Sequence, residues 1–251
     1  MTKLVERLTA LLNGLAAGST SAADAEHLLA PAVHRVDDGR DLLGQGPQPN
    51  LRIAIARLAR VEAGGWACLL VRPGRLAGLR GPAELTRDAL AQPPRPELGA
   101  VPVVVGHHGQ VAIVGVAELP ESEALDHDSL TLRILPAERP LSPATPAEAS
   151  LALSTAMREA ASALTELGTV AGSRPNPADT IRLGGDYPPA NQRLLDQSLT
   201  VLAIVAAAAE ASPELPHSHA VTSRARALDQ LRSAALDGVQ SALSWPTTLM
   251  H

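Results

Sequence analysis

Residues 101–117 read VPVVVGHHGQVAIVGVA, and this stretch decides the fold. Two valine-rich apolar runs, 101–105 and 111–117, flank the polar tip Gly-His-His-Gly at 106–109. β-Branched residues are enriched in strands, and glycine supplies the backbone freedom that a tight turn needs. The stretch therefore predicts a β-hairpin in the middle of the chain.

Further strands are predicted on either side of this hairpin. Residues 66–72 form an apolar run, and Pro73-Gly74 then predicts a tight turn into another strand over 75–79. Residues 129–134 alternate apolar and polar side chains, as a strand with one solvated face does. The middle of the chain is therefore expected to form a mostly antiparallel sheet of four to five strands, with helices packed on one side.

Helix signals flank the predicted sheet and fill the C-terminal part of the chain. Leucines at three- and four-residue spacing predict an amphipathic N-terminal helix. Thr145 and Glu148 form the pattern of a capping box, with Pro146 in the first turn, so a long helix begins there. The predicted helices span residues 2–16, 22–34 with an interruption near Pro31, 51–62, 82–92, 145–168, 190–211 and 219–243. A loop rich in Gly, Pro and Asp is predicted over 37–49.

These elements together predict an α+β fold. Residues 1–140 form the part that holds the sheet, and residues 145–251 form a helical part with three long helices. A single sheet needs a cover for its apolar face. We therefore expect the N-terminal helices, the sheet and the C-terminal three-helix segment to pack as one core in a single domain.

The composition argues against some kinds of partner. Phe is absent, there are one Tyr and two Trp, and Lys3 is the single lysine among 21 positive charges. This bias is typical of a GC-rich coding sequence and indicates a bacterial protein. The scarcity of aromatic rings argues against a single-stranded nucleic-acid site, which stacks bases on such rings. The isoelectric point near 5.9 and the lack of a DNA-binding motif also argue against nucleic acid as a partner.

One cysteine and the hydropathy pattern indicate the cellular setting. Cys68 alone excludes an internal disulfide, and its place in the apolar run 66–72 predicts a buried side chain. No apolar stretch reaches the roughly 20 residues that a membrane-spanning helix needs. The N-terminal leucines predict an amphipathic helix rather than a signal peptide. We therefore expect a soluble cytoplasmic protein with no membrane partner.

Positive charge is concentrated in one segment. Seven arginines and two glutamates lie between residues 51 and 87, while the whole chain carries a net charge of −5. Three of these arginines surround the Pro73-Gly74 turn and precede a predicted helix, a setting that suits a phosphate or a carboxylate. Two histidines at the predicted hairpin tip complete this candidate anion-binding site. Its residues are Arg72, Arg75, Arg80, His107 and His108. The alternative is a solvated basic surface that pairs with the acidic residues between 118 and 128.

No catalytic fingerprint accompanies the basic segment. The sequence contains neither a glycine-rich phosphate loop nor a nucleophile elbow. His217 and His219 have the i, i+2 spacing that can place two imidazoles on one metal ion, but the pattern offers no third ligand, which a zinc site needs. No metal ion or cofactor is therefore expected. Asp37 and Asp38 beside His34 are explained by the turn-forming role of aspartate rather than by acid–base catalysis.

Two functional hypotheses follow. The first is a non-enzymatic interaction or regulatory protein, whose alanine-rich helices contact a protein partner or a second copy in a homodimer. The second is an enzyme or a sensor that binds an anionic small molecule near Arg72, Arg75 and Arg80. The sequence favours the first hypothesis, because it offers no pair of nucleophile and base.

Overall fold

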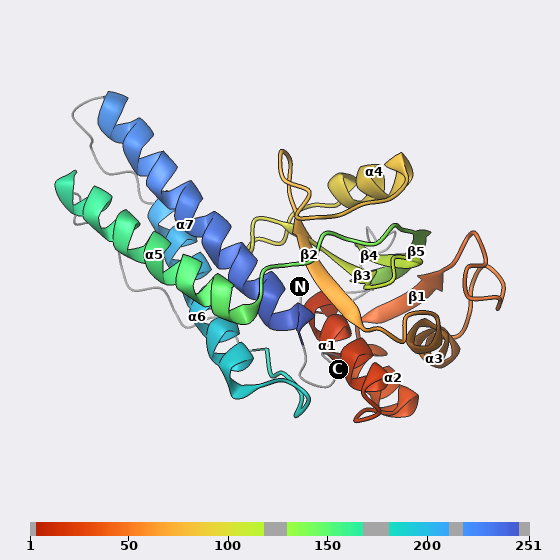
Figure 1. Cartoon of the computed structure of the whole chain (residues 1–251). Coiled ribbons are helices and arrows are strands. Elements are labelled where there is room, and N and C mark those ends of the chain that lie inside the picture. Colours follow the sequence, from red (N-terminus) through yellow and green to blue (C-terminus); the bar gives the residue numbers. More distant parts are fainter. Residues whose placement is uncertain (1–3, 118–129, 168–180, 211–217, 246–251) are drawn as a thin grey trace. The chain divides into compact units, whose positions relative to one another are not determined.

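The computed structural model describes residues 4–117, 130–167, 181–210 and 218–245 (Figure 1). The chain divides into two compact units. Unit 1 consists of residues 1–143, 181–188 and 243–251, and unit 2 consists of residues 144–180 and 189–242. The prediction that both parts share one core in a single domain stays a prediction.

Among the described residues, unit 1 contains the sheet and four helices, and unit 2 is helical. The elements of unit 1 are α1 (Leu4–Ala16), α2 (Ala22–Leu29), β1 (Val33–Asp37), α3 (Leu51–Val61), β2 (Trp66–Val71), α4 (Ala83–Ala91), β3 (Val101–Gly106), β4 (Val111–Ala117) and β5 (Leu130–Pro136). Those of unit 2 are α5 (Pro146–Glu166), α6 (Pro189–Glu210) and α7 (Ser218–Ser244) as far as Ala242.

The five strands form one sheet in the order β1-β5-β4-β3-β2. The pairs β2–β3, β3–β4 and β4–β5 are antiparallel, and β1 pairs with β5 in parallel. The predicted α+β fold and the hairpin over 101–117 are therefore confirmed. The sheet is mixed rather than purely antiparallel, because an unpredicted strand joins one edge.

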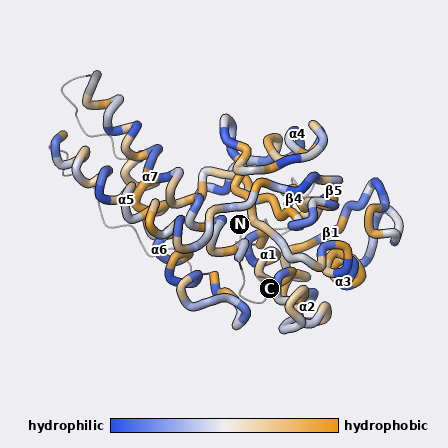
Figure 2. Tube along the Cα trace, in the orientation of Figure 1, coloured by the Kyte–Doolittle hydropathy of each residue, from blue (hydrophilic) through white to orange (hydrophobic). Residues whose placement is uncertain are grey.

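Helices cover both faces of the sheet, where the sequence predicted a cover on one. On one face α1, α2 and α3 pack side chains such as Leu8 around Trp66. On the other face α4 packs Leu85 against Val103. Successive side chains of a strand point to opposite faces, so every residue of β2 and β3 is buried. Cys68 in β2 is buried as predicted, and this burial raises the pKa of its thiol. The trace near the label β4 in Figure 2 is mostly orange, the colour of hydrophobic residues, as expected of a strand in a covered sheet.

The predicted helix over 22–34 is too long. It ends at Leu29, and β1 begins at Val33. Pro31 has no N–H to donate and clashes with a continuing helix, so the chain leaves the helix there. Val33 and Val36 are then buried beside β5. The pairing with a strand a hundred residues away, which local spacing does not reveal, makes this segment a strand.

The predicted strand over 75–79 is also wrong, although the turn before it is present. Arg72 and Arg75 exchange two backbone hydrogen bonds of 2.9 Å around Pro73-Gly74. Beyond the turn, Ala77 has φ 54° and Gly78 has φ 87°. These left-handed conformations interrupt an extended strand, so the chain departs from the sheet after the turn.

The described residues of unit 2 form long helices, and the predicted start of α5 is confirmed. The capping box of α5 is present, with Thr145 Oγ1 accepting from Glu148 N and the Glu148 side chain accepting from Thr145 N. In the contact between α6 and α7, Asn191 Nδ2 donates to Ala242 O at 3.1 Å. Across the described part of the chain, every helix is too short or too polar to span a lipid bilayer.

Candidate functional site

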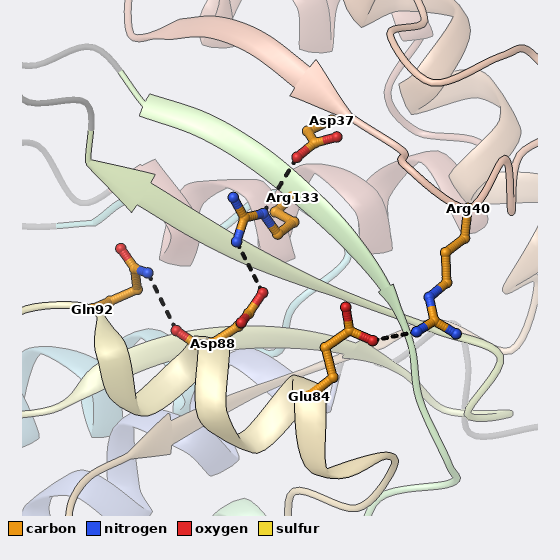
Figure 3. Close-up of polar contacts among 6 residues, drawn as sticks. All are labelled: Asp37, Arg40, Glu84, Asp88, Gln92 and Arg133. Atoms are coloured by element: carbon orange, nitrogen blue, oxygen red, sulfur yellow. Dashed lines mark hydrogen bonds and ion pairs between the residues drawn. The ribbon is translucent and has the colours of Figure 1, made fainter.

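A pocket of about 370 Å³ opens in unit 1 beside the parallel strand pair and α4 (Figure 3). This volume lies within the range typical of small-molecule sites. We call it the charged pocket. The described residues that line it are Asp37, Gly39, Arg40, Glu84, Asp88, Arg133, Ile134 and Leu135. They come from β1 and the loop that follows it, from α4 and from β5.

Arg133 lies between two carboxylates of the charged pocket. Its Nε donates to Asp37 Oδ2 at 3.3 Å, and its Nη1 donates to Asp88 Oδ2 at 2.9 Å (Figure 3). The hydrogen bond to Asp88 is the largest cause that raises the pKa of the Arg133 guanidinium. Asp37 reaches Arg133 because the two residues are register partners in β1 and β5. The sheet and α4 together therefore hold this guanidinium in one orientation.

The loop that carries Arg40 is held by its own aspartates. Asp38 is fully buried, and its two carboxylate oxygens accept from the backbone N–H groups of Leu42 and Leu43 at 2.9 and 2.8 Å. This is the turn-forming role that the sequence predicted for Asp38. Arg40 extends from the loop and forms an ion pair with Glu84 of α4 (Figure 3). The rim of the pocket is thus supported by backbone hydrogen bonds.

Sequence reasoning missed the charged pocket because its residues are scattered between positions 37 and 135. The available signals were weak. Arg133 is the single charged residue of the strand predicted over 129–134, and Asp37 ends the segment that turned out to be β1. Only the parallel register of β1 and β5 places the two side chains together.

A second polar cluster lies at the end of the β3–β4 hairpin, around Glu62. The Glu62 side chain is fully buried. Its Oε2 accepts from His108 N at 3.0 Å and its Oε1 accepts from Gln110 N at 2.6 Å. A Cβ on Gly106 would overlap this carboxyl group, so glycine is needed beside it. Glu62 therefore stabilises the turn that the sequence predicted.

The two hairpin histidines have structural contacts in this cluster. His108 is exposed, and its Nδ1 lies 3.6 Å from Glu62 Oε2. His107 Nε2 lies 3.3 Å from the carbonyl oxygen of Ser244, and its ring centre lies 5.8 Å from that of Trp245. Burial lowers the pKa of His107, and the hydrogen bond with Ser244 opposes this shift.

The free energy of unfolding of unit 1 is expected to depend on the protonation of His107. Because its pKa is lowered in the fold, the unfolded chain takes up the proton first as the pH falls below about 6.5. Stability that is fully present above this pH is then lost as the pH falls through the lower pKa of the folded state. Urea unfolding followed by tryptophan fluorescence between pH 7.5 and 5.5 should show the loss. It should be smaller in His107→Gln and unchanged in His34→Gln, which alters an exposed histidine.

The predicted anion site is divided between two ends of the β2–β3 ladder. Val71 pairs with Val101, and Trp66 pairs with Gly106. Arg72 follows Val71 and His107 follows Gly106, so about five residue steps, or roughly 17 Å, separate the two ends of the ladder. The register therefore does not bring the Arg72–Arg75 turn to the histidines.

Arg80 is exposed, and its backbone is linked to the hairpin through residues 138 and 139. The carbonyl oxygen of Arg80 accepts from Glu138 N at 3.1 Å, and Arg139, which follows Glu138, lies against Gly109 of the hairpin turn. Anion binding by Arg72, Arg75, Arg80, His107 and His108 stays a prediction. The acidic residues between 118 and 128, which the alternative interpretation pairs with the arginines, lie outside the described residues.

The comparisons with known proteins concern the helices. Residues 147–239 match the family described as Rv1486c-like protein, C-terminal domain. The matched range begins in α5, includes α6 and ends in α7, and it covers less than half of the chain. Neither a curated protein nor a solved structure matches the chain. The charged pocket lies outside the matched range.

Proposed function

We propose that this chain is a non-enzymatic regulatory protein that recognises a small molecule bearing a protonated amine. The observation that carries the proposal is the charged pocket, which combines a suitable volume with a supported rim and fixed charges. A pocket whose polar groups are already held in place loses little conformational entropy when a ligand enters.

The charges that line the pocket favour a cationic ligand. Its described lining holds three carboxylates and two guanidinium groups, an excess of one negative charge. Arg133 bonds one oxygen each of Asp37 and Asp88. An ionised carboxylate has two oxygens and about four acceptor positions, so each can also accept from an ammonium group. The ion pairs with Arg133 hold these two carboxylates in place.

The side chains of the pocket support binding rather than covalent catalysis. The described lining residues include no Ser, Cys, Lys or His side chain that could act as a nucleophile, and the carboxylates that line the pocket form ion pairs with Arg40 and Arg133. The single lysine of the chain, Lys3, lies outside the described residues, so no described residue of the pocket can form a Schiff base. Recognition of a ligand, with the bound state as a signal, is the activity that this arrangement supports best.

The proposal is tested with n-butylamine and two probes of the same shape, n-butanol and butyrate. We expect butylamine to raise the melting temperature of the full chain, and neither control probe to do so at equal concentration. The substitution Glu84→Gln should weaken butylamine binding by about tenfold, because it removes the excess negative charge of the described lining. Isothermal titration calorimetry measures this change.

The matched control is Glu159→Gln, the same substitution at an exposed position of α5, which should bind butylamine like the wild type. A chain stabilised by butyrate and not by butylamine would overturn the proposal and favour the anion site predicted around Arg75. Equal weakening by both substitutions would mean that the amine binds outside the charged pocket.

The predicted protein partner or homodimer and the cytoplasmic location stay predictions. Unit 2 supports an interaction role with large apolar side chains that are exposed on each of its helices. Leu151 of α5 is 68% exposed, Ile204 of α6 is 45% exposed and Val221 of α7 is 52% exposed. Side chains of this kind contribute to contacts between helices of different chains.

A further inference from the structure

Arg95 lies just before β3 and is almost completely buried, with 7% of its surface exposed. Its Nη1 has no hydrogen-bond partner among the described residues. A guanidinium stays protonated in proteins, so it cannot avoid the cost of burying a charge by becoming neutral. Buried charges in folded proteins are accordingly paired with an opposite charge. The buried guanidinium of Arg95 therefore requires a negatively charged group next to it.

A small cavity of about 10 Å³ adjoins Arg95 in unit 1. Apolar residues such as Val5, Val101 and Leu130 form much of its wall, and Gln92 is a polar side chain of the lining. No carboxylate occurs among the described lining residues. A cavity of this volume has room for about one water-sized group.

We infer that this cavity binds one monovalent anion of about the size of chloride, paired with the guanidinium of Arg95. Water fits the space but carries no charge that could neutralise the guanidinium. This site goes beyond the proposed function, because it takes an anion at Arg95 whereas the charged pocket takes a cation beside Arg133.

A competing source of negative charge exists in the sequence. The cavity is lined by Ala117 and Leu130, the two described residues that flank the segment 118–129. That segment lies outside the described residues and contains Glu118, Glu121, Glu123, Asp126 and Asp128. The test therefore has to separate a free anion from a carboxylate of the chain itself.

Chloride binding is measured on the full chain by the line width of the chlorine-35 NMR resonance in sodium chloride. We expect excess broadening with the wild type, reversed by bromide, which competes for the same site. Arg95→Met should weaken chloride binding by about tenfold or more, because the charged partner is removed. Arg57→Met, the same substitution at an exposed arginine of α3, should leave the binding unchanged.

A second variant blocks the cavity and keeps Arg95. Gly115 lines the cavity, and a Cβ there would lie 2.9 Å from Val5 Cγ2 and 3.6 Å from Leu130 Cδ1. Gly115→Ala should therefore narrow the space and weaken chloride binding, with the guanidinium still present. Butylamine binding should be unchanged in both variants, so the chloride site and the charged pocket are tested independently of each other.

Two outcomes would overturn the inference. The first is equal chloride broadening in the wild type and in Arg95→Met. The second is broadening that is absent from the wild type and appears only after the five acidic residues of 118–129 are replaced by their amides. In that case a carboxylate of the chain, and not a free anion, neutralises Arg95.

Discussion

Replacing Asn13 with alanine is expected to lower the free energy of unfolding of unit 1 by about 3 to 5 kcal/mol, since each buried polar group left unpaired costs about 1 to 3 kcal/mol. Asn13 lies on α1 and is fully buried. Its Oδ1 accepts from Trp66 N at 2.7 Å, and its Nδ2 donates to Trp66 O at 3.0 Å. The side-chain amide thus makes the pair of bonds that a neighbouring strand would make to the edge strand β2.

The same amide joins two further segments of unit 1. Asn13 Nδ2 lies 2.8 Å from Tyr187 Oη and 3.2 Å from Leu243 O, and the Tyr187 hydroxyl donates to Leu243 O at 2.8 Å. Ser244 Oγ accepts from Cys68 N at 3.1 Å, farther along the same edge of β2. An edge strand left open is a template for pairing with another chain. Loss of Asn13 should therefore also promote aggregation.

Urea unfolding followed by tryptophan fluorescence checks this expectation, because Trp66 and Trp245 both belong to unit 1. The matched control is Asn50→Ala. Asn50 is exposed and caps α3 by accepting from Arg52 N at 2.9 Å, and loss of such a cap costs about 1 kcal/mol. Equal losses in the two variants would contradict the structural role of Asn13.

Substituting Gly106 with alanine is the second change with a large expected effect. The added Cβ would overlap the buried carboxyl group of Glu62. Glu62 would have to leave its place and give up the backbone N–H groups of His108 and Gln110. We expect a loss of about 3 kcal/mol or more in the free energy of unfolding, from overpacking together with unpaired buried groups. The same fluorescence measurement applies.

A control and a double variant identify the cause of this loss. Gly185→Ala should change stability little, because a Cβ there would meet no heavy atom within 4 Å. Glu62→Ala should itself destabilise the hairpin. Combined with Gly106→Ala, it should cost less than the sum of the two single changes, because the overlap no longer exists. Additive losses would show that the clash with Glu62 is not the reason.

The sequence by itself determined the local elements of this protein. The hairpin over 101–117, the capping box at Thr145 and the burial of Cys68 were all predictable, because each depends on residues close together in the chain. Turn residues, caps and apolar spacing act over a few positions, and their effects do not depend on distant partners. The α+β class follows from the same local patterns.

Only the tertiary structure decided how distant segments meet. β1 is a strand because it pairs with β5, and this pairing brings Asp37 to Arg133 and creates the charged pocket. The register of β2 and β3 likewise separates Arg72 from His107. Strand order and register are set by which apolar faces can be buried together. That condition involves the whole unit, so a single stretch of sequence does not reveal it.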